Sequence, residues 1–345
     1  MQLILHIGTE KTGSTSIQEF LRNNRARLYE NKIYIPLSTM WGNGNQGWFR
    51  FFAHKHSYYD EFTATEFQNN EQRKSSFFTN LIDQFSAEIN ESSLTCDTVI
   101  ISSEHLSSRL LDKEDISRLH DFCASLFETI KVIIYIREPL SYAISLFSQR
   151  LKGGAIIDCL PDASNCRFTS HDLLIQSWIE CFPNTEFVVR RFQEDALVDG
   201  DIQKDFFCIS MSTLDINGYQ LSKKANLSLS LTGMVVQRRM NMLFPRLIDG
   251  KQNPFWPHLN TFIAEHTNDG SQFLPTLEEF NRYKEFFLES NEFIRQKYFP
   301  EVEILFNDQF NLSPAKINLS SVPVDPEIYE HLISVLWRRN QRSHW

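Results

Sequence analysis

Four short runs of residues are almost continuously apolar and rich in β-branched side chains. They occupy residues 3–8, 98–103, 131–137 and 186–190. None of them alternates cleanly between apolar and polar positions, so each is typical of a strand that is buried on both faces. The four runs therefore predict a parallel sheet with helices on both sides.

Stretches with helical spacing lie between these runs. Apolar side chains recur three or four residues apart in three stripes: Ile17, Phe20, Leu21 and Leu28; Ile116, Leu119, Phe122, Cys123 and Leu126; Leu140, Ile144, Phe147 and Leu151. Such stripes indicate amphipathic helices that cover a core. Strands that alternate with helices place the chain in the α/β class, and we expect about four or five parallel strands flanked by helices.

Two parts of the chain depart from this alternation. Residues 38–61 mix glycines with tryptophan, phenylalanine, tyrosine and histidine, which is typical of a long loop over a site. From residue 222 the pattern is mainly helical, over residues 227–244, 276–298 and 326–339, and Thr276 with Glu279 predicts a capping box. We expect an α/β core at 1–221, with an insertion at 38–61, and a helical portion at 222–345 that packs on it within the same domain.

Composition excludes several classes of protein. The 345 residues are 42% hydrophobic and 22% charged, with 29 phenylalanines, which indicates a globular core. The net charge of −9 argues against general nucleic-acid binding. No window is apolar over the ~18 residues of a membrane span. The first residues indicate a strand rather than a signal peptide, so we expect a cytoplasmic protein with reduced thiols. The six cysteines form no C-x-x-C pair, and zinc spacing is absent.

The first apolar run leads into a glycine-containing turn and then into a helix. Gly8 and Gly13 have the spacing of a P-loop, but Ser14 stands where the Walker A motif requires lysine. The lysine, Lys11, lies at the crown of the turn instead. A turn of this kind directs backbone N–H groups and the positive end of a helix towards an anion.

A second candidate site follows the run at 131–137. Arg137 ends that run, Pro139 suits the first turn of a helix, and Ser145 follows Arg137 by eight residues. An arginine at a strand end and a serine two turns into the next helix can converge on one phosphate. The alternative is that Arg137 caps a carbonyl group or pairs with neighbours of Glu138, and that Ser145 is incidental.

The Lys-Thr-Gly-Ser-Thr crown, together with the Arg137–Ser145 spacing, resembles the sulfotransferases that use 3'-phosphoadenosine 5'-phosphosulfate (PAPS), in particular bacterial members that act on carbohydrates. The resemblance implies a P-loop kinase-like sheet. It also implies that Lys11 stabilises the leaving group while Arg137 and Ser145 bind the 3'-phosphate. The remaining residues implied to bind the donor are Glu10, Thr12, Gly13, Ser14 and Thr15 in the turn, with Lys224 and Asn226 in a segment that folds over the nucleotide.

The same resemblance implies a general base near the end of the second core strand. Family members use glutamate or histidine there, and Glu104 and His105 follow the run at 98–103. Both residues remain candidates at this point. A carboxylate beside Lys11 would be kept ionised, which favours Glu104 slightly.

The resemblance further implies transfer of a sulfuryl group from PAPS to a hydroxyl acceptor on a sugar or glycoconjugate. The product nucleotide would be adenosine 3',5'-bisphosphate (PAP), and no metal is required. Trp48 and His54 in the insertion are candidate acceptor contacts. The alternative is that this insertion forms a small hydrophobic cluster and that His54 is an ordinary loop residue.

Three other classes of protein compete with this interpretation. In a P-loop ATP-dependent kinase, Glu104 would serve Mg²⁺ at the end of a Walker B strand, but Gly-Lys-Ser/Thr is missing. A nucleotide-binding module without transferase activity is the second alternative. A glycosyltransferase would usually carry a metal-binding Asp-x-Asp motif, and we do not favour this third class.

Overall fold

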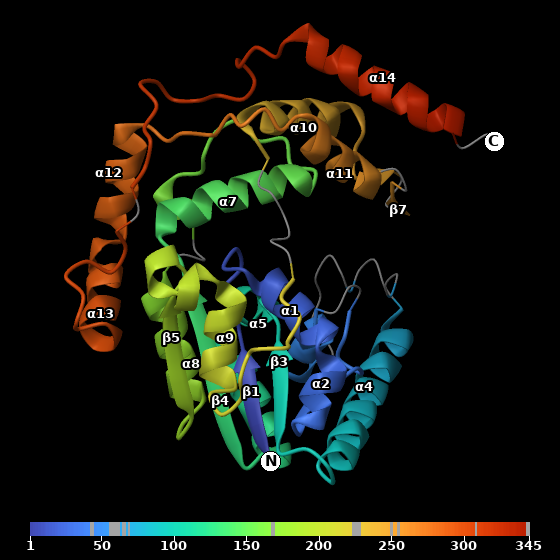
Figure 1. Cartoon of the computed structure of the whole chain (residues 1–345), viewed down its shortest axis with the longest axis vertical. Helices are drawn as coiled ribbons and strands as arrows, with labels where there is room; N and C mark the ends of the chain where they lie inside the picture. The colour runs from blue at the N-terminus through green and yellow to red at the C-terminus, as the bar shows by residue number, and fades with distance from the viewer. Residues whose placement is uncertain are drawn as a thin grey trace. The chain divides into compact units, whose positions relative to one another are not determined.

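Five parallel strands form the central sheet, in the order β2-β3-β1-β4-β5 (Figure 1). They are β1 Gln2–His6, β2 Ile33–Tyr34, β3 Thr98–Ser102, β4 Thr129–Ile136 and β5 Glu186–Arg191. Four of them match the apolar runs in the sequence, which confirms the expected α/β class and parallel sheet. The two-residue strand β2 is too short to show as such a run.

The computed structural model describes the whole chain except residues 42–44, 55–62, 64–66, 68–69, 167–169, 223–228, 249–250, 254–255, 308 and 343–345. Within the described part, the sheet is apolar on both faces. Leu3 and Leu5 pack into one cluster, whereas Ile4 between them packs into another. This alternation follows from the two-residue period of a strand, and it is why the strands show as continuous apolar runs.

Different helices contribute to the two faces. The cluster around Ile4 receives α1 Ser14–Asn23, α2 Arg25–Glu30 and α9 Ile202–Ser210. The cluster around Leu5 receives η1 Gly47–Phe52, α4 Glu71–Ser92, α5 His105–Arg109, α6 Lys113–Leu126, α8 His171–Cys181 and α13 Leu288–Tyr298. The short turns η4 Glu194–Ala196 and η5 Val198–Gly200 precede α9.

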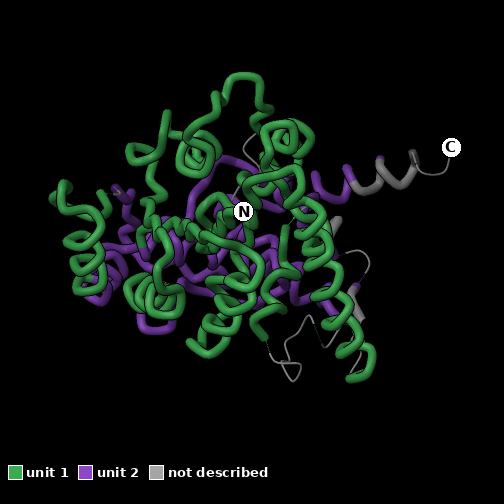
Figure 2. The backbone as a smooth tube through the Cα atoms, turned by 90° about the horizontal axis from the view of Figure 1, so that it is seen from below, with its two compact units in different colours: residues 1–138, 168–225, 288–308 green, residues 139–167, 226–287, 309–345 purple. Residues whose placement is uncertain are grey.

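The chain divides into two compact units that are discontinuous in sequence (Figure 2). The first unit comprises residues 1–138, 168–225 and 288–308 and contains the sheet. The second comprises residues 139–167, 226–287 and 309–345. The domain division at residue 221 stays a prediction.

The second unit is mainly helical, as expected for the C-terminal part. Its elements are α7 Pro139–Lys152, η2 Ala163–Asn165, α10 Leu231–Leu243, β6 Leu247–Ile248, β7 Lys251–Gln252, α11 Trp256–His266, α12 Leu277–Phe286 and α14 Pro326–Arg342. Apolar residues of α7, α10, α11 and α12 form its core. The stretch expected as one helix at 276–298 is two helices, because Phe287 separates α12 from α13.

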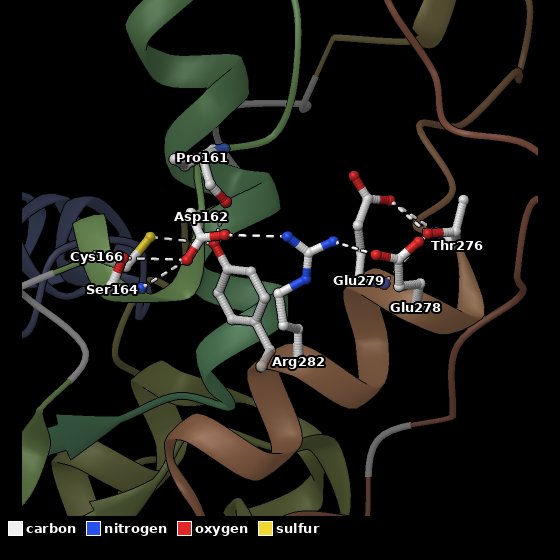
Figure 3. A network of polar contacts seen from close by, with 9 residues as sticks. Pro161, Asp162, Ser164, Cys166, Thr276, Glu278, Glu279 and Arg282 are labelled. Carbon is white, nitrogen blue, oxygen red and sulfur yellow. Dashed lines mark hydrogen bonds and ion pairs between the residues drawn. The ribbon is translucent and has the colours of Figure 1, made fainter.

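Polar contacts anchor α12 within the second unit (Figure 3). The expected capping box is present, since the Thr276 hydroxyl accepts from the Glu279 backbone and the Glu279 carboxylate accepts in return. Arg282 pairs with Asp162 at 3.1 Å and with Glu278 at 2.7 Å. These contacts join the first turns of the helix to the loop that follows α7.

Candidate functional site

The turn between β1 and α1 depends on left-handed backbone conformations. The φ angles are 98° at Gly8, 62° at Lys11 and 81° at Gly13. A Cβ atom on Gly8 would lie 3.0 Å from the Cα atom of Glu104, so both the conformation and the close approach require glycine there. The turn is therefore built directly against the end of β3, where the candidate base lies.

Hydroxyl groups within the turn hold its shape. Thr12 Oγ1 donates to the Thr9 carbonyl oxygen at 2.6 Å, and Ser14 Oγ donates to the same atom at 3.2 Å. Thr9 in turn donates from its backbone and its side chain to the carbonyl oxygen of Tyr135 on β4. Since the two hydroxyls point at the turn itself, its backbone N–H groups are the better candidates to bind an anion.

Helix α1 directs its positive end at the same turn. Gly13 is its N-cap residue, no side chain caps the helix, and no acidic residue lies in its first turn. The first N–H groups of a helix have no partner within the helix and attract anions. Thr15 lies in this first turn. Anion binding by residues 12–15 stays a prediction.

Arg137 lies against the crown of the turn. Its Nη1 atom donates to the Lys11 carbonyl oxygen at 2.9 Å, which is the carbonyl-capping role left open by the sequence. Its guanidinium carbon also lies 5.7 Å from the ring centre of Phe192. The contact joins the arginine at the end of β4 to this turn across 126 residues of sequence. We call the turn at residues 8–15 the anion turn.

A buried histidine fixes the backbone of this arginine. The Nε2 atom of His171 lies 2.9 Å from the Arg137 carbonyl oxygen, and the His171 side chain is fully buried. Burial lowers the pKa of His171 to about 4. The imidazole is therefore neutral at pH 7 and donates one hydrogen bond to the strand end.

For three of the predicted donor-binding residues, a place beside this group stays a prediction. Ser145 lies on α7 in the second unit and is 9% exposed, whereas Arg137 belongs to the first unit. Lys224 and Asn226 lie outside the described residues. The convergence of Arg137 and Ser145 on one phosphate stays a prediction.

Glu104 is the N-cap residue of α5, at the carboxyl end of β3, and is partly buried. Its Oε2 atom accepts from Gln18 Nε2 at 2.6 Å, and its Oε1 atom accepts from Asn45 Nδ2 at 3.0 Å. Burial raises the pKa of Glu104, a hydrogen bond with its own backbone and the two amide hydrogen bonds oppose this shift, and the charge of Glu10 raises the pKa further. The shift is thus opposite to the one expected from a neighbouring Lys11.

The second candidate base has different surroundings. The ring centre of His105 lies 5.8 Å from that of Trp41. A Cβ atom on Gly47 would approach His105 Cδ2 to 3.2 Å, so glycine at this position allows the backbone to lie close to the histidine. Beside it, Glu10 of the turn pairs with Arg109 of α5 at 3.7 Å. We call the described residues of the insertion at 38–61 the aromatic segment.

The described part of the aromatic segment packs into the core of the first unit. The ring of Trp48 lies 4.9 Å from that of Phe77. The His54 side chain is buried, with Nδ1 3.2 Å from the Asp115 carboxylate, and Arg118 pairs with the same carboxylate. These contacts fit the alternative of a hydrophobic cluster, and acceptor contacts of Trp48 and His54 stay predictions.

Two residues of this site escaped sequence reasoning. Gln18 lies within the apolar stripe of α1, and Asn45 lies in the irregular aromatic segment. Each amide meets Glu104 only after folding, over separations of 86 and 59 residues. A polar residue among the apolar residues of a helix is a signal in the sequence that could have identified Gln18 as a site residue. No such signal marks Asn45.

An Asp-x-Asp triplet does occur in the sequence, at Asp199 and Asp201. Asp201 caps α9 by accepting from Gln203 and Lys204, and Asp199 pairs with the Lys204 side chain at 2.8 Å. The triplet therefore begins a helix here. Among the described residues, no group of three or more histidine, cysteine or acidic side chains is placed to hold a metal ion.

Two open cavities lie at the amino edge of the sheet, opposite the anion turn. Their volumes are about 400 and 590 Å³, and both are lined by Gln2, Glu128 and Thr129. Ligands of open α/β sheets bind at the carboxyl ends of the strands. The chemical groups described above lie at that edge, so we place the candidate site there rather than in these two cavities.

Comparisons with known proteins give distant relatives. No family model matches the chain. An uncharacterized protein of Archaeoglobus fulgidus is 24% identical over 190 residues, 54% of this chain and 49% of that protein, so the match spans about half of the relative. In the described part of the chain, no helix has the length and apolar character needed to cross a membrane.

Among solved structures, the chain is similar to a sulfotransferase from Alicyclobacillus acidocaldarius. The TM-score is 0.34 at 12% identity, over 74% of this chain and 98% of that one. The sulfotransferase domain from the curacin biosynthetic pathway gives a TM-score of 0.34 at 14% identity, over 84% and 97% of the two chains. Both likenesses are distant, so the residues of this chain have to carry any functional conclusion.

Proposed function

We propose that the protein is a sulfotransferase that moves a sulfuryl group from PAPS to a hydroxyl acceptor. The observation that carries this proposal is the turn after β1, whose shape is held by side-chain hydrogen bonds. Its Lys-Thr-Gly-Ser-Thr crown leads into an uncapped helix, Arg137 contacts its backbone, and Glu104 lies against its first glycine. Anion-binding groups and a candidate base thus share one edge of the sheet.

The transfer needs few protein groups. The acceptor oxygen bonds to sulfur, the bond between sulfur and the 5'-phosphate oxygen breaks, and the hydroxyl proton passes to Glu104 or His105. Lys11 stabilises the charge that develops on the leaving oxygen, and the N–H groups of residues 12–15 hold the 5' group. Such reactions depend chiefly on positioning and charge stabilisation, and no step here requires a metal.

The acceptor side is the finer part of the proposal. A sugar or glycoconjugate hydroxyl is supported by the likeness of the crown to carbohydrate sulfotransferases and by the aromatic segment beside His105. Aromatic rings such as Trp41, which is 39% exposed, can stack on sugar rings.

The test is calorimetric titration with adenosine 3',5'-bisphosphate and, separately, with ATP, each with Mg²⁺ and with chelator. The proposal requires tight binding of the bisphosphate that does not depend on metal. Mg²⁺-dependent ATP binding without preference for the bisphosphate would instead support the kinase alternative. Bisphosphate binding without any bisphosphate release from PAPS would support a nucleotide-binding module.

An arginine variant tests the assignment of the 3'-phosphate. In Arg137→Ala, we expect affinity for the bisphosphate to fall by about 10- to 100-fold, the value of a lost charged hydrogen bond. Affinity for AMP should fall less, because only the contact with the Lys11 backbone is lost. Arg109→Ala is the matched control: it removes one positive charge near the turn and should weaken both nucleotides alike. Equal losses in Arg137→Ala would contradict the assignment.

A further inference from the structure

The candidate base is held from two directions by neutral amides. Gln18 donates to one oxygen of Glu104 and Asn45 to the other, at 2.6 and 3.0 Å. Each carboxylate oxygen can accept about two hydrogen bonds, so one amide on each oxygen does not exhaust the capacity of the carboxylate. Such a carboxylate is oriented and still able to accept a proton.

The first amide donor, Gln18, lies on the helix that follows the anion turn. Gln18 lies on α1, one helical turn after Ser14, where the anion turn ends. The same Nε2 atom lies 3.4 Å from the carbonyl oxygen of Ser102 at the end of β3. One rigid helix therefore sets the separation between the anion turn and the carboxylate of Glu104.

Asn45 ties the aromatic segment to the same carboxylate. Its backbone carbonyl accepts from the Trp41 N–H group at 2.7 Å, and its Oδ1 atom lies 3.4 Å from the Ser103 hydroxyl. Trp41 packs against His105. The segment thus covers the histidine ring and presents an amide to the glutamate.

We propose that Gln18 and Asn45 are positioning residues for the carboxylate of Glu104 as base of the transfer, an inference that rests on the proposed sulfotransferase function. Gln18 couples the base to the anion turn through α1, and Asn45 couples it to the aromatic segment. During transfer the acceptor proton moves to a Glu104 oxygen while the sulfuryl group leaves the nucleotide. His105 takes no proton in this scheme.

The direct test is carbon-13 NMR of the protein labelled at glutamate side-chain carboxyls, with the Glu104 signal identified by its loss in Glu104→Gln. We expect the Glu104 carboxyl to titrate above the ordinary glutamate range. In Gln18→Met, loss of an amide donor to the ionised form should raise its pKa by about one unit. Asn45→Ala should shift it in the same direction and provides a second route if Gln18→Met does not fold.

Gln203→Met is the matched control, because Gln203 is also a buried glutamine on a helix of the first unit. Its side chain exchanges hydrogen bonds with Ser222. This variant should leave the Glu104 pKa unchanged. A Glu104 pKa that stays constant in both Gln18→Met and Asn45→Ala would overturn the positioning role.

The catalytic part is tested with water as acceptor, by following bisphosphate release from PAPS across pH. The rate should depend on a pKa equal to that of the Glu104 signal, and both should move together in Gln18→Met. If the pKa in the rate profile did not move with the Glu104 signal, Glu104 would not be the base. Unchanged affinity for the bisphosphate in the same variant would leave the proposed function intact. Failure of the wild-type protein to bind bisphosphate would instead remove the proposed function itself.

Discussion

Two carboxylates of the first unit are withdrawn from solvent and compensated in different ways. Asp205 on α9 is fully buried, and Arg190 donates to both of its oxygens, at 2.5 and 3.1 Å. The Tyr135 hydroxyl adds a third hydrogen bond at 2.7 Å. Glu104 is the second of these carboxylates. It is partly buried, and the neutral amides of Gln18 and Asn45 donate to it.

The two carboxylates differ in their donors, which are a charged guanidinium at Asp205 and neutral amides at Glu104. A full positive charge lies beside Asp205, so removal of either partner leaves an uncompensated charge at a buried position. Amide donors stabilise an ionised Glu104 more weakly, while burial favours the neutral form. A proton acceptor needs this second kind of environment, because its pKa has to lie near the working pH.

Asp205→Asn breaks the first kind of site and should have the largest effect on stability. The substitution leaves Arg190, whose side chain is 30% exposed, without its charge partner. Breaking a buried pair costs about 3 kcal/mol or more. Denaturant unfolding should show this loss at pH 7. As a control, Lys113→Met removes an exposed pairing with Glu180 and should leave the midpoint almost unchanged.

Glu104→Gln should have a pH-dependent effect of the opposite sign. Because the folded state raises the pKa of Glu104, it holds a proton that the unfolded chain, with an ordinary pKa of about 4.3, has already released. The contribution of this carboxyl is therefore complete below pH 4.3 and is lost as the pH rises towards the folded pKa.

The variant has no such loss, so it should gain stability relative to the wild type as the pH rises, by about 1.4 kcal/mol for each unit of upward pKa shift. Denaturant unfolding of both proteins at pH 4.5, 6 and 8 measures the difference. A difference that does not change with pH would contradict the upward pKa shift of Glu104.

The fold could be predicted from the sequence to a greater extent than the site. A strand that is buried on both faces shows in the sequence as a local apolar run, and four of the five strands were predicted in this way. The two-residue β2 and the long helix α4 did not, because their stability comes from packing rather than from a local pattern.

The sequence predicts one edge of the sheet for the candidate site, but not the contacts within it. Glu104 and the anion turn lie where strands end, which a parallel sheet dictates. The contact of Arg137 with Lys11 joins residues 126 positions apart, and the amide of Gln18 reaches Glu104 across 86. Contacts over such separations depend on how the helices pack, and a single sequence does not encode them locally.

Tyr135→Phe should have the smallest effect and sharpens the comparison. It removes one hydrogen bond to Asp205 while Arg190 stays in place, so we expect a loss of about 1 kcal/mol in unfolding free energy. Tyr34→Phe is a matched control, since that hydroxyl donates to the partly exposed Glu88 at 2.7 Å, and water can replace it. If Tyr135→Phe were to cost as much as Asp205→Asn, the hydroxyl rather than the cation would stabilise the Asp205 charge. The two carboxylates would then differ in burial alone, and the contrast between charged and neutral donors would fail.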